Sequence, residues 1–594
     1  MNIRTLIILA TFLVISSTTF AQYPHPSKVD LRFDRWYTFE ELENAMHALA
    51  EAYPDLIQIK SLGKSVGGHD IWLLTMNNSA TGPDTAKPAM YIDGNIHGNE
   101  IQAAEVVLYS IWYLAKSHGK IDSLTKLIDE RAFYFVPCAN PDGREYWFNQ
   151  PSTPHDLRGG IRPVDNDYDG LLDEDPPDDL DGDGHITSMW APDPMGRWKP
   201  DPDDKRFFIR VDRDDPPGGW TRLGQEGIDN DGDGQVNEDN IGGYDPNRNW
   251  PSEWAPTHVQ RGSTDYPFSL PETRVIGEFM HEHPNIAAVQ SYHNTGGMIL
   301  RGPSVKHISY PRSDDQVHEE LSLLGSKIIP HYKSLVTWKD LYTVYGGQTE
   351  WTYEGLGIAS FTNELWTDRK MFNTSENPSE EDRRQFRDLL QFSDVYVPYR
   401  EVDHPTYGRI LVGGTTKYSS RVTPTWMQQE DLHRNFAFTM LHADHMPQVK
   451  WGNLQVRSGP GDLWEITAEV RNPKIIPTIL QHARNKRIGN PDMLECMAGP
   501  GNRVVASGTV RNFMPWEKLD AQETTRPHRI VNPQGVGRKG NRIFRFLVEG
   551  EGAVELVYSS DKGGSITIPV ELAPTPMADM TPPDTSLLIP ELDS

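Results

Sequence analysis

The sequence predicts an α/β fold with a mixed central sheet covered by helices on both faces, followed by a small C-terminal β-sandwich. Two observations predict this fold class. Up to about residue 448, apolar strand-like runs alternate with stretches in which apolar residues recur every three or four positions. From residue 449 on, short β-type runs follow one another with turns and no helical pattern between them.

The elements of the α/β part follow in order along the chain. TFEELENAMHALAEAYP is typical of a helix, IWLLTM and AMYIDG of strands, and IQAAEVVLYSIWYLAK of a second helix. RAFYFVPCA is predicted as a buried strand that ends in the turn signal NPDG. Further on, PETRVIGEFMHEHP is predicted as a helix, AAVQSYH and GLGIASFTNEL as strands, and PTWMQQEDLHRNFAFTMLHADHM as the last long helix. Strands that alternate with helices form a mostly parallel or mixed sheet.

The chain divides into four parts. Residues 1–21 have the pattern of a signal peptide, with Arg4 before a short apolar run and a small-residue site at Ala21, so we expect an exported protein, secreted or periplasmic. Neither this run nor any later one is long enough to span a bilayer, which needs about 20 apolar residues. The α/β domain covers 22–448 with an irregular insertion at 151–241, the β-sandwich covers 449–572, and 573–594 form a Pro-rich tail.

Acidic residues are concentrated in the insertion. The net charge of the chain is −27, and residues 165–239 alone contain 23 Asp and Glu against 7 Lys and Arg. Phosphate binding requires a basic face, so this distribution argues against nucleic acid as a partner and suggests cations. The two cysteines, Cys138 and Cys496, fall in different predicted domains, and we expect both to be free thiols.

Three segments of the insertion, DNDYDG, DLDGDG and DNDGDG, place Asp at alternate positions and Gly directly after the third Asp. This is the front half of an EF-hand loop, which gathers oxygen ligands around Ca²⁺. None of them has the Glu that closes such a loop, so they resemble shortened calcium loops with a structural role. The alternative is a solvated acidic loop. The candidate ligands are Asp165, Asp167, Asp169, Asp173, Asp179, Asp181, Asp183, Asp229, Asp231 and Asp233.

His97 and Glu100, in GNIHGNE, lie in the turn between a predicted strand and a predicted helix. Imidazole and carboxylate are ligands of catalytic zinc, which takes three protein ligands and keeps one position open. The turn follows the C-terminal end of a strand, where open α/β sheets place ligand sites. His293, at the end of AAVQSYH, is the candidate third ligand. From spacing alone, a chance match among the 20 histidines and an ordinary strand-end histidine stay open as alternatives.

Six segments, HGNE, NPDG, DPNRNW, QSYH, LYTVYGGQTEW and FTNEL, occur in this order. Together they resemble the zinc carboxypeptidases of the carboxypeptidase A type, the M14 metallopeptidase family. The resemblance covers roughly residues 31–448. It implies the fold of those enzymes and one catalytic zinc ion held by His97, Glu100 and His293. It also implies removal of single residues from the C-termini of peptides or proteins.

The resemblance implies roles for further residues. Glu364 matches the catalytic glutamate, which takes a proton from the zinc-bound water and passes it to the leaving amine. Asn247 and Arg248 match the pair that binds the terminal carboxylate of the substrate, which a guanidinium can hold with two hydrogen bonds. Tyr342 matches the tyrosine that closes over the substrate, and Thr349 occupies the floor of the specificity pocket.

The arginine that would polarise the scissile carbonyl is harder to place, because the register is lost after NPDG. Arg158 is our prediction, with Arg144 and Arg162 as alternatives. The same fold could act on cell-wall stem peptides. A protein of a different class could bind or adhere without catalysis, although the retention of Glu364 argues against this. The β-sandwich could support folding, attach the protein or bind substrate.

Overall fold

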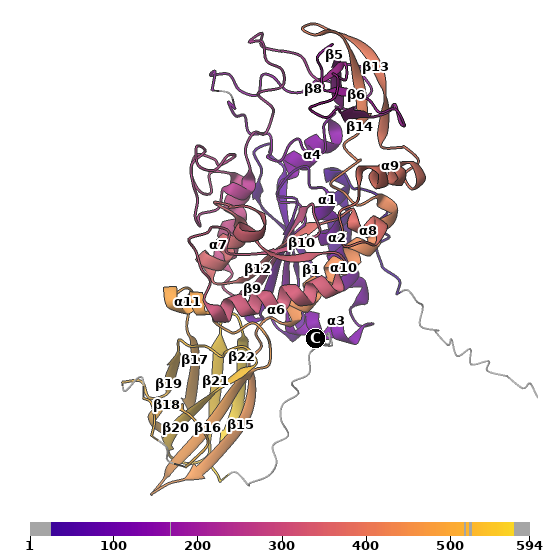
Figure 1. Cartoon of the computed structure of the whole chain (residues 1–594). Coiled ribbons are helices and arrows are strands. Elements are labelled where there is room, and N and C mark those ends of the chain that lie inside the picture. The colour runs from indigo at the N-terminus through magenta and orange to yellow at the C-terminus, as the bar shows by residue number, and fades with distance from the viewer. Residues whose placement is uncertain (1–24, 167, 516–517, 522–524, 575–594) are drawn as a thin grey trace, which may run out of the picture.

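The computed structural model describes residues 25–574 apart from 167, 516–517 and 522–524. Figure 1 shows a central α/β body with a β-rich lobe at one end and a β-sandwich at the other. The predicted signal peptide, nearly all of the predicted tail and Asp167 lie outside the described residues. In the part of the chain that the structure describes, no helix has both the length and the apolar character to cross a membrane.

The body contains an eight-stranded sheet in the order β1-β2-β4-β3-β9-β12-β10-β11. The strands are β1 Ile57–Lys64, β2 Asp70–Met76, β3 Ala89–Gly94, β4 Ala132–Val136, β9 Ile286–Asn294, β10 Met298–Arg301, β11 Lys333–Val336 and β12 Ala359–Leu365. The four central strands β4, β3, β9 and β12 are parallel, whereas β1, β2 and β10 pair antiparallel with their inner neighbours. The predicted mixed sheet is therefore confirmed.

Helices cover both faces of this sheet. Met90 and Ile92 of β3 pack into one core with α1 Phe39–Ala52, α2 Gln102–Ser117, α3 Asp122–Glu130, α6 Arg312–Ile328 and α10 Thr425–Asp444. Tyr91, between them, faces a second core with α5 Pro271–Glu282 and α7 Gln348–Leu356. Successive side chains of a strand point to opposite faces, so a strand buried on both faces is apolar throughout. This explains why β3 begins with the apolar run AMYI, which is followed by the buried Asp93.

NPDG begins a helix rather than closing a turn. Asn140 is the N-cap of α4 Pro141–Asn149, and its side chain accepts a hydrogen bond from the backbone N–H of Gly143 at 2.9 Å. Asn at the N-cap and Pro at the first helical position are a start signal for a helix. The same residues are common in turns. The prediction of a turn at NPDG was therefore wrong, because this segment caps and begins α4.

The lobe is a six-stranded sheet in the order β13-β14-β5-β8-β6-β7, to which two distant segments of the chain contribute. The insertion provides β5 Ser188–Pro192, β6 Trp198–Pro200, β7 Phe208–Arg210 and β8 Trp220–Gln225. The connection between β12 and α10 provides α8 Arg369–Phe372, α9 Glu380–Leu389, β13 Tyr396–His404 and β14 Gly408–Thr415. Trp190 of β5 stacks on Phe208 of β7, with ring centroids 4.1 Å apart.

The C-terminal segment forms two four-stranded sheets, β15-β16-β20-β18 and β19-β17-β21-β22. The strands are β15 Lys450–Ser458, β16 Leu463–Asn472, β17 Asp492–Ala498, β18 Arg503–Val510, β19 Arg529–Asn532, β20 Gly540–Glu549, β21 Ala553–Ser560 and β22 Gly564–Glu571. Ile466, Leu494, Phe546 and Tyr558 from both sheets share one core. One short helix that the sequence pattern did not show, α11 Gln481–Lys486, lies between β16 and β17. Cys138 and Cys496 are buried free thiols.

Candidate functional site

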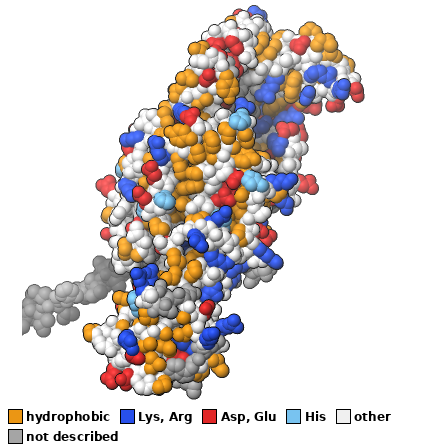
Figure 2. Space-filling model, turned by 90° about the vertical axis from the view of Figure 1, so that its left-hand side faces the viewer, with side chains coloured by type: hydrophobic (Ala, Val, Ile, Leu, Met, Phe, Trp, Pro, Cys, Tyr) orange, Lys and Arg blue, Asp and Glu red, His pale blue; other side chains and the backbone are white. Residues whose placement is uncertain are grey.

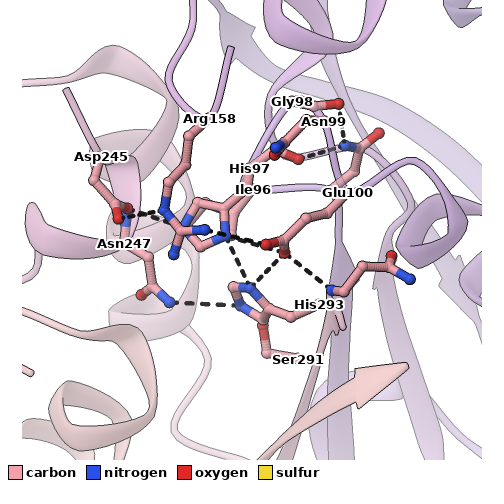
Figure 3. Close-up of polar contacts among 12 residues, drawn as sticks. Ile96, His97, Gly98, Asn99, Glu100, Arg158, Asp245, Asn247, Ser291 and His293 are labelled. Carbon is pink, nitrogen blue, oxygen red and sulfur yellow. Dashed lines mark hydrogen bonds and ion pairs between the residues drawn. The ribbon is translucent and has the colours of Figure 1, made fainter. Parts of the chain in front are cut away.

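The three predicted zinc ligands meet at the C-terminal ends of β3 and β9, which are neighbouring parallel strands. Nδ1 of His97 lies 3.0 Å from Oε2 of Glu100 and 3.1 Å from Nδ1 of His293. Oε2 of Glu100 is 2.9 Å from Nδ1 of His293. All three side chains are buried, and Figure 3 shows them turned toward one another.

These residues fit a zinc ion. Nδ1 of His97 and Nδ1 of His293 lie 3.1 Å apart. Two neutral imidazoles can place only one proton between these two nitrogens. A cation among the three donor atoms would instead satisfy both nitrogens and the carboxylate at once. Two imidazoles and one carboxylate are also the donor set of catalytic zinc sites with one open position.

A tight turn brings His97 and Glu100 to the same side of the sheet. Asn95 has a φ of +57°, and its side-chain amide donates to the carbonyl oxygens of His97 at 2.7 Å and Gly98 at 3.1 Å. Asn tolerates this left-handed conformation better than most residues. A Cβ at Gly98 would lie 2.6 Å from the Cα of Gly143, so only glycine fits this close approach.

Asp245 orients two groups of the site, and the sequence analysis did not single it out. Its Oδ1 lies 2.9 Å from Nε2 of His97, and its Oδ2 accepts from Nε of Arg158 at 2.7 Å. Burial alone would raise the pKa of Asp245, but the charges of Arg158, Arg248 and His97 hold it well below its usual range. The ionised carboxylate therefore accepts from Nε2–H of His97 and leaves Nδ1 free to bind a metal. The available signal was its place at the head of DPNRNW.

Of the three candidate arginines, Arg158 is the one that reaches the ligand cluster. Its Nη1 donates to Oε1 of Glu100 at 3.2 Å. Arg144 is fully buried, and its Nη2 donates to Glu105 at 2.7 Å, away from the cluster. Arg162 forms an ion pair with Asp265 at 2.5 Å, where both side chains are partly exposed.

Asn247 and Arg248 lie on the short helix η3 Pro246–Arg248, beside the ligand cluster. Nδ2 of Asn247 is 3.5 Å from Nε2 of His293. Arg248 is buried, its Nη1 donates to the carbonyl of Asn247 at 2.7 Å, and its Nε is buried without a hydrogen-bond partner among the described residues. A buried guanidinium with an unused donor is suited to an anionic group.

Glu364 lies on β12 directly opposite His293 of β9 in the strand register. Its Oε2 is buried and has no hydrogen-bond partner in the described part of the chain. Burial and the neighbouring charge of Glu100 raise the pKa of Glu364 to about 7. Thr349 of α7 contacts this strand, because its Oγ1 lies 2.5 Å from Oγ1 of Thr362. Tyr342 is half-exposed and follows the short π-helix η4 Thr337–Leu341.

Arg421 belongs to the site and was missed by sequence reasoning. Its Nη2 donates to Oε1 of Glu100 at 3.1 Å and to the carbonyl oxygen of Asn294 at 2.7 Å. The residue lies in the connection between β14 and α10, which carries no recognisable motif. Its position follows from the fold of the lobe and could not be deduced from local sequence.

The acidic loops group differently from the predicted triplets. Asp229, Asp231 and Asp233 do bring their carboxylates together, whereas Asp179 and Asp181 meet Glu226 rather than Asp183. Asp169 meets Glu174 and Asp231 across two loops. Oδ1 of Asp183 instead accepts from N–H of His185, Oδ1 of Asp173 from N–H of Val164, and both oxygens of Asp165 accept from N–H groups of its own loop.

Parts of the chain are similar to known protein families and to curated carboxypeptidases. A zinc carboxypeptidase family model matches residues 42–167 and 218–387, and a model described as a domain of unknown function matches 448–571. Carboxypeptidase D of Drosophila melanogaster is 30% identical over 144 residues, which is 23% of this chain and 10% of that protein. Carboxypeptidase B2 of Rattus norvegicus is 23% identical over 351 residues, 56% of this chain and 63% of that protein.

Among solved structures, carboxypeptidase A of Helicoverpa armigera aligns with 18% identity and a TM-score of 0.39, over 68% of this chain and 75% of that chain. This chain covers less than two thirds of the length of the two curated relatives. Residues 168–217, which the first family model leaves unmatched, fall within the acidic insertion.

Proposed function

Because the chain belongs to the zinc carboxypeptidase family, we propose that it is an exported zinc-dependent carboxypeptidase that hydrolyses the C-terminal peptide bond of peptides or proteins. One observation carries this proposal. The carboxylate of Glu364, whose Oε2 is buried and has no hydrogen-bond partner in the described part of the chain, lies on the strand next to that of His293, where His97, Glu100 and His293 converge. This arrangement supports a general base beside a metal site with room for one more ligand.

The chemistry divides between the metal and the chain. When bound by His97, Glu100 and His293, zinc supplies a Lewis acid at its open position. Glu364 accepts a proton from the attacking water at Oε2 and donates it to the nitrogen of the leaving residue. Asp245 holds His97 in the tautomer whose Nδ1 is free, through the contact at Nε2.

Two arginines act on the substrate. Arg248, with Asn247, holds the terminal carboxylate, which restricts cleavage to the last peptide bond. Arg158 uses Nε and Nη1 to contact Asp245 and Glu100, and its Nη2 has no hydrogen-bond partner in the described part of the chain. That amino group can donate to the carbonyl oxygen as negative charge develops on it. Tyr342, half-exposed beside Arg158, can close over the bound residue.

The test is hydrolysis by the purified full chain of blocked dipeptides with free or amidated C-termini and of cell-wall stem peptides. We expect release of the C-terminal residue from free-ended peptides only, loss of activity with a zinc chelator and recovery on addition of Zn²⁺. Cleavage confined to stem peptides would favour the cell-wall substrate. A zinc-loaded protein that binds these peptides without hydrolysing any of them would favour the binding protein.

We also propose that the insertion holds Ca²⁺ in a structural role. Residues 165–175 and 229–239 share one pattern of 11 residues, with Asp at positions 1, 3 and 5, Gly at 6, Glu at 10 and Asp at 11. The last Asp of each loop accepts from backbone N–H groups of the other, since Asp175 accepts from Asn237 at 2.7 Å and Asp239 from Asn166 at 3.0 Å.

The glutamates of this loop pair support the same proposal. Both carboxylate oxygens of Glu174 and Oε2 of Glu238 are shielded from solvent and have no donor partner among the described residues. Each of these glutamates faces a carboxylate of the other loop, Asp239 for Glu174 and Asp175 for Glu238, and burial together with this neighbour raises the pKa of both glutamates to about 7. Carboxylates crowded together repel one another when ionised, and a cation that both loops share would remove that cost.

A further inference from the structure

A cavity of about 430 Å³ opens beside the zinc-ligand cluster. Its walls come from the turn after β9, from α8 and α9, and from the segment that leads into α10. Arg421 joins the two sites, because it lines the cavity and donates to Glu100. None of the residues that would hold the terminal carboxylate or the side chain of the leaving residue lines this cavity.

The cavity lies on the far side of the cluster from the carboxylate-binding pair. Figure 3 shows Asn247 and Glu100 on opposite sides of the two imidazole rings. Arg421 contacts Glu100, and Asn247 contacts His293, so the cavity and the carboxylate-binding pair flank the metal position. A peptide whose terminal carboxylate is held by Asn247 and Arg248 must therefore extend from the scissile bond toward the cavity.

Positive charge dominates the wall of the cavity. The lining residues include four arginines and one carboxylate, namely Arg369, Arg383, Arg387, Arg421 and Asp368. Figure 2 shows basic side chains in the hollow between the lobe and the body. Two of these arginines pair with carboxylates, Arg383 with Asp368 and Glu380 and Arg421 with Glu100, whereas Arg369 and Arg387 form no ion pair among the described residues.

The pairing of these arginines leaves donors unused. Asp368 accepts from Nε of Arg383 at 2.9 Å. Arg369 is buried, and its guanidinium donates, among the residues that the structure describes, only to neutral oxygens, those of Thr367 at 3.2 Å and Gly296 at 3.0 Å. The guanidinium of Arg387 is partly buried and lies over the ring of Phe207, 5.8 Å from its centroid, but it makes no hydrogen bond or ion pair among the described residues. Nε of Arg421 is buried without a partner there.

We propose that this cavity binds a carboxylate group on the N-terminal side of the scissile bond, so that acidic residues in that part of the substrate are preferred. The inference rests on the proposed carboxypeptidase function. Guanidinium groups bind carboxylates through paired, charge-assisted hydrogen bonds, and partly buried ones gain most from such a partner. A neutral side chain of equal size would leave the same donors unpaired.

Binding of peptide pairs tests this directly. The zinc-loaded Glu364→Gln protein, which retains the cavity, is titrated with N-acetylated tripeptides that differ only in Glu or Gln before the C-terminal residue. We expect the Glu peptide to bind about tenfold more tightly, the effect of one charged hydrogen bond. Equal affinities for the two peptides would overturn the proposal.

Matched variants locate the preference. Arg387→Gln, added to the same protein, should remove most of the difference between the two peptides. Arg384→Gln is the control, because Arg384 lies on the same helix but pairs with Asp201 and does not line the cavity. If the Glu peptide still binds more tightly than the Gln peptide after Arg387→Gln, or if Arg384→Gln removes the difference equally, the preference arises in another part of the molecule and the proposal fails.

Two further arms separate the outcomes. The first arm uses stem peptides in which the α-carboxylate of a γ-linked glutamate is either free or amidated. It distinguishes a carboxylate of cell-wall origin from the acidic side chain of an ordinary peptide. Tighter binding of the free carboxylate in the stem-peptide pair, or of Glu in the tripeptide pair, supports the proposed role of the cavity. Failure of the wild-type enzyme to hydrolyse any peptide would overturn the proposed function, whereas the binding comparison still decides on the cavity. Hydrolysis without any preference, together with equal affinities, would overturn the cavity alone.

Discussion

At the scale of single residues, Asp245 connects groups that are far apart in the sequence. It accepts from His97, 148 positions away, and from Arg158, 87 positions away. We predict that Asp245→Asn lowers zinc affinity or kcat/KM about 10–100-fold, because the neutral amide no longer fixes the tautomer of His97. Chelator competition and kinetics measure the two effects. The control is Asp265→Asn, which removes the exposed partner of Arg162. If Asp245→Asn had the same zinc affinity and kcat/KM as this control, the role of Asp245 would be contradicted.

The carboxylate of Glu364 gives the sharpest test of the proposed chemistry. Glu364→Gln keeps the shape of the side chain but cannot accept the proton of the attacking water. We expect zinc content and peptide binding to be retained, while kcat falls by roughly three orders of magnitude or more. Single-turnover kinetics on protein of known zinc content provides the measurement. Near-normal turnover would rule out Glu364 as the base.

The sequence identified the ligand set more readily than the residues that support it. His97, Glu100 and His293 lie in short segments with a recognisable pattern, and the structure brings them together. Arg421 lies in a connection whose path depends on the packing of the whole lobe. Its contact with Glu100 joins residues 321 positions apart, and no local spacing encodes such a contact.

At the scale of elements, the acidic loops carry a prediction about calcium. Arg158 precedes Asp165 by seven residues, and Asp245 follows Asp239 by six, so the loop pair borders two residues of the site. A calcium-selective chelator should lower the melting temperature, since binding to the native state alone contributes roughly 2.7 kcal/mol at a hundredfold excess over Kd. Turnover should fall while zinc stays bound.

A matched pair of variants assigns this effect to the loops. Glu174→Gln should reduce the calcium content and the response to the chelator, whereas Glu376→Gln, at an exposed position, should change neither. Elemental analysis and calorimetry provide the readouts. A protein without calcium whose melting temperature ignores the chelator would leave only the solvated acidic loop.

Buried Asp492 of the β-sandwich predicts a pH dependence of stability. Burial raises its pKa from 3.8 to about 6, even though Thr478 and Tyr558 donate hydrogen bonds to the carboxylate. Between these two values the folded chain holds a proton that the unfolded chain has released. The group therefore stabilises the fold below about pH 4, and this contribution is lost as the pH rises to about 6.

The corresponding variant is Asp492→Asn, which keeps an acceptor oxygen but buries no charge. The free energy of unfolding of this variant, taken relative to that of the wild type, should rise by an amount on the order of 1–3 kcal/mol between pH 4 and pH 7. Its melting temperature should rise with it. Calorimetry at several pH values measures the difference. Glu555→Gln, exposed on β21, should show no such trend. A difference that is constant with pH would contradict the assignment to Asp492.

Elements with strong local patterns were predictable, and those made by distant pairing were not. The strand AMYIDG and the helix that follows it have continuous apolar or helical periodicity over many residues. The lobe strands β6 and β7 have only three residues each, and β5 pairs with β14 across more than 200 positions of sequence. Such short strands acquire their structure from tertiary contacts that periodicity does not reveal.

At the scale of the whole molecule, the β-sandwich docks at the end of the body opposite the site. Lys562 donates to the carbonyl oxygen of Ile286 at 2.7 Å, at the start of β9, whereas His293 lies near the end of that strand. Figure 1 shows the sandwich and the lobe at opposite ends. Of the roles left open by the sequence, this placement favours support of the catalytic body.

The junction between body and sandwich contains a fully buried ion pair. Nζ of Lys474, just after β16, lies 2.8 Å from Oδ1 of Asp444, the last residue of α10. We predict that Lys474→Met destabilises the protein by about 3–5 kcal/mol, because it leaves the carboxylate of Asp444 buried and unpaired. Arg503→Met removes an exposed partner of Glu549 and should cost at most about 1 kcal/mol.

Denaturant unfolding of the full chain measures both effects. The kcat/KM of the zinc-loaded folded fraction should stay unchanged, because the pair of Lys474 and Asp444 lies at the other end of the body from the zinc ligands. Adding Asp444→Leu to Lys474→Met should recover most of the lost stability, because an apolar pair replaces the isolated charge. If Lys474→Met cost no more than Arg503→Met, the junction would contribute little to folding. The sandwich would then be better explained as an attachment module or a substrate-binding arm than as a support.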